Sequence, residues 1–349
     1  MNNLPLLAIT LVDGTEIPNI LFWPILVLFL SMFLCMFLIY IRNKVSQQLG
    51  KALIIASIVL CVVLAIVCLS LIGSYYNEQI KNDGYYSNFF KSVPLYFTAI
   101  MLIIVMVALV FAIGRHTTFE FDSRSVAFAA VCIAMSFALS YIRVYKLPQG
   151  GSITLASLLP VMLFSYIFGI KKGFLVGIIY GVLQAIQDPY IIHPAQFLLD
   201  YPVAFSAIAF AGVFSEIKAL EKAPQVSFML GAILTGVFRF LSHFCSGAFA
   251  FGAYAGDAGY NNVYIYSLAY NSFVFVDIIV AIVIGVILLS SPAFMHEIVY
   301  KQRSKIKPVV TQPKTLELNE DAHTVEVTSH SKDFDLLPKD NNDNASKKD

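Results

Sequence analysis

Residues 264–290 read YIYSLAYNSFVFVDIIVAIVIGVILLS, and this stretch decides the fold class. Beyond Asn271 it is apolar over the length of a helix, and Asp277 is its single charged residue. A run of about 20 apolar residues is long enough to cross a bilayer as a helix, in which the backbone polar groups bond to one another. The stretch therefore predicts a transmembrane helix.

Similar apolar stretches recur along the whole chain, although some are shorter than a usual span. Together they give about nine candidate spans, at 20–41, 52–75, 94–114, 125–142, 152–170, 173–187, 197–214, 226–250 and 264–290. The sequence thus predicts an all-α polytopic membrane protein with about nine transmembrane helices.

The composition supports a membrane protein and excludes other classes. Of the 349 residues, 58% are hydrophobic and only 13% are charged, and the mean hydropathy is +0.76; soluble domains are about 25% charged. The net charge of +1 leaves no basic stripe for nucleic acid. The five cysteines lie in apolar runs without metal-binding spacing, so we expect neither a metal site nor a disulfide framework.

The distribution of Lys and Arg predicts the orientation in a cell membrane. Basic residues gather at 42–51, 115–124, 171–172, 218–222 and 301–307, whereas the alternate loops are poor in them. Since basic loops stay in the cytoplasm, we expect the N-terminus outside and the C-terminus inside.

Three regions are expected: a three-helix membrane extension at 1–123, a six-helix domain at 124–292, and a polar cytoplasmic tail at 293–349 with the composition of a disordered segment.

Polar residues inside three of the apolar stretches are the best indication of function. Asp200, His243, Tyr266 and Asn271 each fall, by helical rise, within roughly 10–12 Å of the outer interface, and ionisable or polar groups at membrane depth mark ligand or ion sites by default. With Tyr201 and Phe251 at the same level, they predict a pocket for a small, flat, cationic ligand, which aromatic faces and a carboxylate would bind.

Each member of this set also has an ordinary structural explanation. The aromatic residues fit an interfacial belt, Asp200 fits a helix cap, and His243 fits a hydrogen-bonded structural histidine. The occurrence of the whole set at one depth favours the pocket over these separate explanations.

Two further charged residues form a second group. Arg239 lies one helical turn before His243, and Asp277 lies well inside the last span. Their estimated depths differ by about 8 Å, which an arginine side chain can largely bridge. We predict an Arg239–Asp277 ion pair, and the alternative is that Asp277 couples transport to protons.

Small residues repeat at four-residue spacing on two helices, where they allow close helix packing. Gly173, Gly177 and Gly181 form one row, and Ala130, Ala134 and Ala138 form the other. Internal packing and the docking of a partner membrane protein are both compatible with such rows.

The sequence has no catalytic signature. It lacks G-x-x-x-x-G-K-[ST], H-E-x-x-H and G-x-S-x-G, and its histidines lack paired ligand spacing. We therefore expect no enzyme, no cofactor, no metal and no ATP bound through a P-loop.

Four stretches between Arg124 and Ser290 resemble the thiamine-specific S component of energy-coupling-factor (ECF) transporters. They are 150–160 (GGSITLASLLP), 173–194 with its three glycines and DPYIIHP, 196–205 (QFLLDYPVAF), and His243-Phe244 with Ser246-Gly247 followed by 266–271 (YSLAYN). They occur in the family's order over about half of the chain.

The resemblance implies a six-helix protein with an outward-facing thiamine pocket, energised by a separate ECF transmembrane coupling protein and two cytosolic ATPases. It implies contacts to thiamine or a close analogue from Asp200, Tyr201, His243, Tyr266 and Asn271, and docking of the coupling protein at Ala130, Ala134 and Ala138. Asp200 stands where the family can have Glu, Phe251 where it can have a stacking Trp, and Gly151 where it can have another aromatic residue.

Two other functions remain open from the residues alone. An ion-coupled transporter of an organic cation would use Asp277 as its coupling group and work without an ATPase. A membrane scaffold or sensor would depend on residues 1–123 and the tail.

Overall fold

The computed structural model describes residues 89–116 and 119–303, together with shorter pieces between Ile9 and Leu71 that include the strands β1 (Ile9–Thr10) and β2 (Glu16–Ile17). The chain forms two units, Met1–Val309 and Val310–Asp349. Most of the predicted spans 20–41 and 52–75, and the tail from 304 onward, lie outside the described residues.

The first two long helices flank a short connection. Helix α3 (Phe89–Ile113) continues into a short 3-10 turn, η2 (Gly114–His116). Helix α4 (Ser123–Ser140) begins with a reciprocal cap, in which Asp122 accepts from the backbone N–H of Ser125 and Ser125 accepts from that of Asp122. Such a capping box satisfies backbone donors that the first turn leaves free.

A β-hairpin follows α4, and it corrects the helix predicted from residue 152. Strand β3 (Arg143–Lys146) pairs antiparallel with β4 (Ser152–Thr154) around the turn η3 (Pro148–Gly150). Helix α5 (Leu159–Phe168) begins only afterwards. Gly150 has φ +89, a backbone conformation that residues with side chains rarely adopt, so residues 150–154 turn and extend and do not begin a helix.

Helix α6 (Ile170–Gln187) packs against a long helical stretch that changes type along its length. This stretch comprises α7 (Pro194–Leu198), the π-helical turn η4 (Leu199–Val203), α8 (Ala204–Ser206) and the 3-10 segment η5 (Ala207–Glu216). Pro202 lies inside η4 and has no N–H to donate. Wide turns of this kind occur frequently at functional sites.

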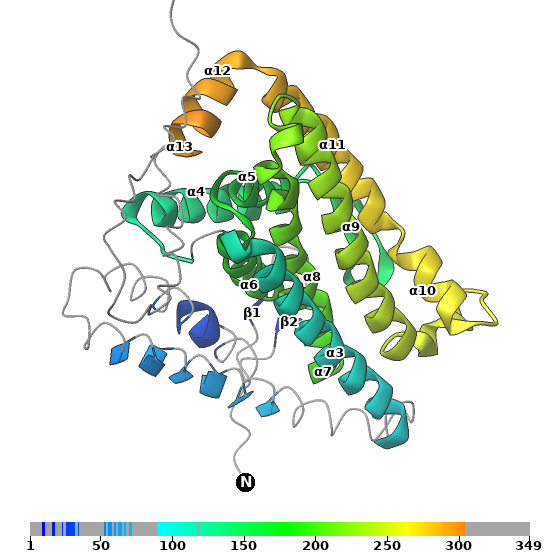
Figure 1. Ribbon diagram of the computed structural model, residues 1–349. Helices are drawn as coiled ribbons and strands as arrows, with labels where there is room; N and C mark the ends of the chain where they lie inside the picture. The colour runs from blue at the N-terminus through cyan, green and yellow to red at the C-terminus, as the bar shows by residue number, and fades with distance from the viewer. Residues whose placement is uncertain are drawn as a thin grey trace, which may run out of the picture. The chain divides into compact units, whose positions relative to one another are not determined.

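The last helices run from one side of the bundle to the other. After η6 (Lys218–Leu220) come α9 (Pro224–Phe249), η7 (Gly252–Ala255), α10 (Val263–Asn271) and α11 (Phe273–Ser290). A terminal helical piece comprises α12 (Pro292–Phe294), the π-helical η8 (Met295–Tyr300) and α13 (Lys301–Arg303). Figure 1 shows α9 and α11 side by side, in agreement with their extensive contacts.

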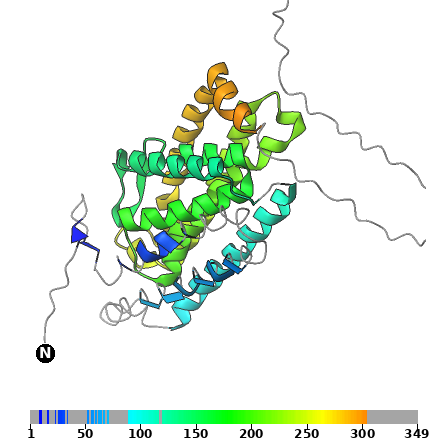
Figure 2. The same ribbon diagram turned by 90° about the vertical axis from the view of Figure 1, so that its left-hand side faces the viewer.

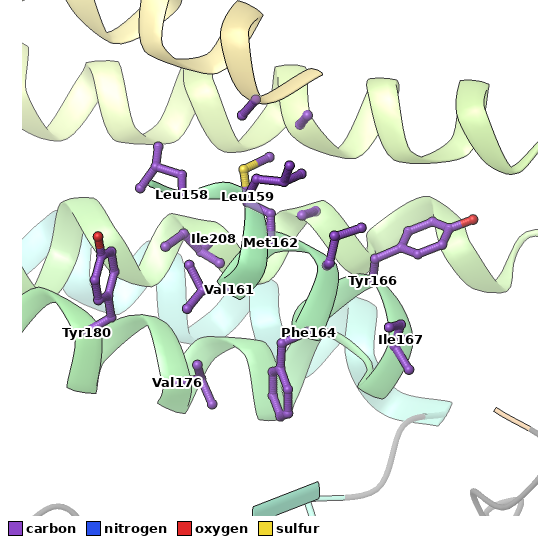
Figure 3. Close-up of a cluster of buried hydrophobic side chains, with 14 of the residues drawn as sticks. Leu158, Leu159, Val161, Met162, Phe164, Tyr166, Ile167, Val176, Tyr180 and Ile208 are labelled. Atoms are coloured by element: carbon purple, nitrogen blue, oxygen red, sulfur yellow. The ribbon is translucent and has the colours of Figure 1, made fainter. Parts of the chain in front are cut away.

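The core lies between α5, α6 and η5. Val161, Met162, Val176, Tyr180 and Ile208 are all fully buried there, and Figure 3 labels them among the side chains of this cluster. Burial of such side chains away from the surrounding lipid allows close packing, which holds helices together in a membrane.

The glycine row of α6 takes part in this internal packing. A Cβ atom added at Gly181 would lie 2.5 Å from the carbonyl oxygen of Tyr201, and one at Gly177 would lie 2.5 Å from that of Phe205. A side chain at either position would therefore push away the helical stretch that contains Asp200.

Five of the described helical segments are long and apolar enough to cross a membrane: Val93–Ile113, Ser123–Ser140, Pro194–Ser215, Pro224–Phe249 and Val263–Ser290. The chain is an all-α polytopic membrane protein.

Candidate substrate-binding site

A cavity of about 940 Å³, which includes open solvent at its mouth, lies between the β3–β4 hairpin and helices α6, η4, α9, α10 and α11. All six residues predicted to bind the substrate line it: Asp200, Tyr201, His243, Phe251, Tyr266 and Asn271. Their three apolar stretches are thus brought together around one space.

Three side chains, none of them Arg or Lys, contact the carboxylate of Asp200. Its Oδ1 atom lies 2.8 Å from Nδ1 of His243, and its Oδ2 atom accepts hydrogen bonds of 2.7 Å from both Ser246 and Gln196. The π-helical turn η4 presents this carboxylate to the cavity. These three contacts hold the carboxylate in place, and none of them comes from Arg or Lys.

His243 has one ring nitrogen in use and one available. Nδ1 faces Asp200, whereas the buried Nε2 atom has no hydrogen-bond partner among the described residues. Because buried polar atoms are rarely left unpaired, this atom is a candidate for contact with a ligand group.

Asn271 is oriented by its neighbours. Its Nδ2 atom donates to the carbonyl oxygens of His243 (3.1 Å) and Ser267 (2.9 Å). These bonds fix the plane of the carboxamide and leave Oδ1 without a hydrogen bond within the described part of the chain.

The aromatic side chains around the cavity have two roles: one holds a loop through its hydroxyl, and the others pack against further aromatic rings. The Tyr201 hydroxyl is already in use, because it accepts from the N–H of Tyr190 at 2.7 Å and donates to the carbonyl of Asp188 at 3.2 Å. Phe251 lies 5.7 Å from the ring of Tyr190 in a tilted arrangement, and Tyr266 lies 6.0 Å from the ring of Tyr270. Tyr190 and Tyr270 therefore extend the aromatic wall, and the sequence reasoning did not assign them to the site.

Tyr270 also explains why glycine stands at position 151. A Cβ atom at Gly151 would lie 2.8 Å from the Tyr270 hydroxyl and 3.2 Å from the ring of Phe273. The same hydroxyl donates to the carbonyl of Pro148 and accepts from the N–H of Gly151. A ring on α10 thus fills the space that a side chain from the hairpin turn would need.

The second charged group forms the ion pair expected from the sequence. Arg239 Nη1 lies 2.9 Å from Oδ2 of Asp277, and both side chains are buried. The other Asp277 oxygen accepts from the N–H and hydroxyl of Thr154 at 3.1 and 2.9 Å. The arginine head lies 4.8 Å from the Phe205 ring centre. This cluster joins α9, α11 and the hairpin.

Three aspartates line the cavity, and one of them has no Arg or Lys partner among the described residues. Asp188 is paired with Arg143 at 3.0 Å and lies 3.7 Å from Lys146, and Asp277 is paired with Arg239. Asp200 has no Arg or Lys within ion-pair distance among the described residues. With histidine counted as uncharged, the two arginines and three aspartates that line the cavity give it a formal charge of −1, which suits a cationic ligand.

The alanine row of α4 lies on the outside of the described bundle. Ala130, Ala134 and Ala138 are exposed, whereas Ala129, Ile133 and Ser136 on the opposite side of the helix are buried.

The comparisons with known proteins agree in the same part of the chain. A family model described as thiamine transporter protein (Thia_YuaJ) matches residues 126–296. The thiamine transporter ThiT of Bacillus subtilis is 35% identical over 159 residues, which are 43% of this chain and 81% of that protein. ThiT of Lacticaseibacillus paracasei is 31% identical over 128 residues, which are 34% of this chain and 63% of that protein.

A solved structure of ThiT from Listeria monocytogenes is also similar, with 27% sequence identity and a TM-score of 0.42; the match covers 48% of this chain and 94% of that one. Given the extent of the match to the Bacillus protein, the chain belongs to the thiamine transporter (ThiT) family, and it is a membrane transport subunit of the S-component type and not an enzyme.

Proposed function

We propose that this chain binds thiamine and serves as the substrate-binding subunit of a vitamin uptake system. The observation that carries the proposal is the Asp200 carboxylate, which lines the cavity without an Arg or Lys partner in the described structure. Thiamine has a permanently cationic thiazolium ring and an aminopyrimidine ring. A carboxylate that is largely shielded from solvent attracts the first and accepts hydrogen bonds from the amino group of the second.

The other lining residues complement these two rings. Phe251 and Tyr266 offer aromatic faces for stacking and cation–π contact. His243 Nε2 and Asn271 Oδ1 supply polar atoms that the protein itself does not use. Tyr201, whose hydroxyl holds the 188–190 loop, acts as a wall of the cavity.

Energy for transport comes, in this proposal, from a separate ECF coupling protein and two cytosolic ATPases. Two observations support it: the sequence has no P-loop of its own, and the exposed row Ala130, Ala134 and Ala138 offers a smooth surface for close helix packing. The distribution of basic residues supports an N-terminus outside the cell membrane and a cytoplasmic C-terminus.

The saturated surroundings of Asp277 support a structural role over proton coupling. Each of its oxygens already has a partner, Arg239 on one side and Thr154 on the other. A carboxylate that must release and bind a proton during transport would lose this pairing in every cycle, at a cost of several kcal/mol.

The decisive experiment is calorimetric titration of the purified full chain with thiamine, with and without Asp200→Ala. We expect sub-micromolar binding by the wild type and a loss of about 100-fold in the variant, since removal of one partner of a desolvated charged contact costs about 2–5 kcal/mol. The isolated aminopyrimidine half of thiamine serves as a second ligand. Absence of thiamine binding by well-folded wild-type protein would refute the proposal.

A further inference from the structure

Helix α3 precedes the region matched by the family model, yet it packs along the binding bundle. Its buried residues Leu95, Ala99, Leu102, Met106 and Val110 follow one another at spacings of three or four, and none is more than 8% exposed. Such spacing places them on one helix face. Figure 2 shows α3, in cyan, lying along the side of the bundle.

The first half of this face contacts the wall of the cavity. Leu95, Ala99 and Leu102 share one buried cluster with Ala195, Leu199 and Val203 of the helical stretch that carries Asp200. The cluster also contains two residues that line the cavity, Phe251 and Tyr266. Apolar contact thus runs from α3 to the helical residues before and after Asp200 and to two aromatic residues that line the cavity.

A second contact links α3 to the start of the same stretch. The ring of Tyr96 meets that of His193 edge to face at 4.9 Å. His193 caps helix α7, because its Nδ1 atom accepts from the N–H of Ala195. Helix α3 therefore touches the stretch at its cap and again at its π-helical turn.

The π-helical turn needs such support from outside. Pro202 has no N–H, and the N–H of Ala204 reaches back five residues to Leu199. The Leu199 carbonyl also accepts from Ser242 of α9 at 2.6 Å. The backbone bonds of this turn are fewer and wider than those of an α-helix, so its conformation depends on neighbouring elements.

We propose that α3 is a positioning element: it holds the Asp200 turn and Phe251 against the cavity and thereby slows the escape of a bound ligand. The part of this inference that concerns a ligand rests on the proposed function. The part that concerns the turn does not, and the two are tested separately.

The first measurement needs no ligand. Hydrogen exchange of the 195–203 segment is compared between the full wild-type chain and the variants Leu95→Ala and Ile104→Ala. Leu95 is fully buried against the cluster, whereas Ile104 on the same helix is 62% exposed. We expect Leu95→Ala to speed exchange in this segment by about tenfold, since a lost contact worth about 1.4 kcal/mol shifts a local opening equilibrium that far. Ile104→Ala should match the wild type.

The second measurement is the dissociation rate of thiamine from the same proteins in the presence of excess unlabelled thiamine. We expect Leu95→Ala to raise the rate by about tenfold while association changes little, because the looser wall acts on escape. Leu95→Met, which keeps the volume, should restore the wild-type rate. A merely structural role would lower thermal stability and leave the dissociation rate of the folded molecules unchanged.

The outcomes separate the two proposals. If wild-type protein binds no thiamine, the proposed function fails and the exchange measurement alone decides on α3. Unchanged exchange at 195–203 in Leu95→Ala, an equal increase in Ile104→Ala, or an increase spread evenly over α5 and α6 would each overturn the positioning role.

Discussion

Two aspartates line the same cavity, Asp277 fully buried and Asp200 partly buried, and they have different surroundings. Asp277 is bound by a guanidinium and by the N–H and hydroxyl of Thr154. Asp200 is bound by Ser246, Gln196 and a ring nitrogen of His243, with no Arg or Lys nearby among the described residues. The difference teaches that the pairing of a carboxylate, more than its depth, separates a structural charge from one available to a ligand.

The largest effect is expected at the structural pair. Asp277→Leu leaves Arg239 buried without a counter-charge, which costs about 3–5 kcal/mol in the free energy of unfolding. Thermal unfolding in detergent should therefore show a large drop in the midpoint temperature. The matched control is the double variant Arg239→Met/Asp277→Leu, which removes both charges and should recover most of the loss. If Asp277→Leu alone were as stable as the wild type, Asp277 would not be a structural charge and its contrast with Asp200 would fail.

At Asp200 the effect should fall on binding and spare stability. Asp200→Asn removes the charge but keeps the shape, and we expect thiamine affinity to fall by about 100-fold, in line with about 2–5 kcal/mol for a buried charged contact. Without ligand, the midpoint of unfolding should change far less than in Asp277→Leu. A stability loss as large as that of Asp277→Leu would show that both carboxylates are structural.

A smaller effect is expected from one of the donors to Asp200. Ser246→Ala removes a bond of 2.7 Å to Oδ2, which is worth about 1.5–3 kcal/mol for a charged acceptor but is partly replaced by Gln196. We expect thiamine affinity to fall by about tenfold. Ser242→Ala, on the same helix as Ser246, removes a bond to the backbone carbonyl of Leu199. It is the matched comparison in the titration and should have the weaker effect on affinity.

The smallest effect at neutral pH concerns the cap of the helix that leads to Asp200. Burial lowers the pKa of His193, which precedes the membrane span, from 6.5 to about 4. As the pH falls from 6.5 to 4, the unfolded chain takes up a proton that the folded chain does not. The free energy of unfolding therefore decreases progressively over this range. Unfolding midpoints between pH 7 and pH 4 should show a shallower decline for His193→Asn, since Asn is a good cap that does not titrate.

The cavity residues could be predicted because they break the pattern of their segments. A carboxylate, an imidazole and a carboxamide stand out in an apolar stretch, and their helical rise placed them near one another. Tyr190, Tyr270 and Gln196 could not be separated in this way, since tyrosines are frequent at membrane interfaces and a glutamine beside a loop is ordinary. Only the folded chain shows that all three side chains line the same cavity.

The β3–β4 hairpin was missed for a different physical reason. Residues 152–158 (SITLASL) are apolar enough to continue a helix, but their backbone pairs with β3 and the N–H of Thr154 binds Asp277. That partner is more than one hundred residues away in the sequence. Local pattern cannot reveal a bond over such a separation, although the two glycines before the strand were a signal for a turn.

The π-helical turn at Leu199–Val203 sets the direction in which the side chains of the preceding helical residues point around the helix axis. Each residue of a helix turns the chain by about 100°, so deletion of one residue from this turn would restore regular α-helical winding and swing Asp200 away from His243 while α8 and η5 kept their place. The wide turn therefore acts as a one-residue spacer: it lets the stretch meet the glycines of α6 with one phase and present its carboxylate to the cavity with another.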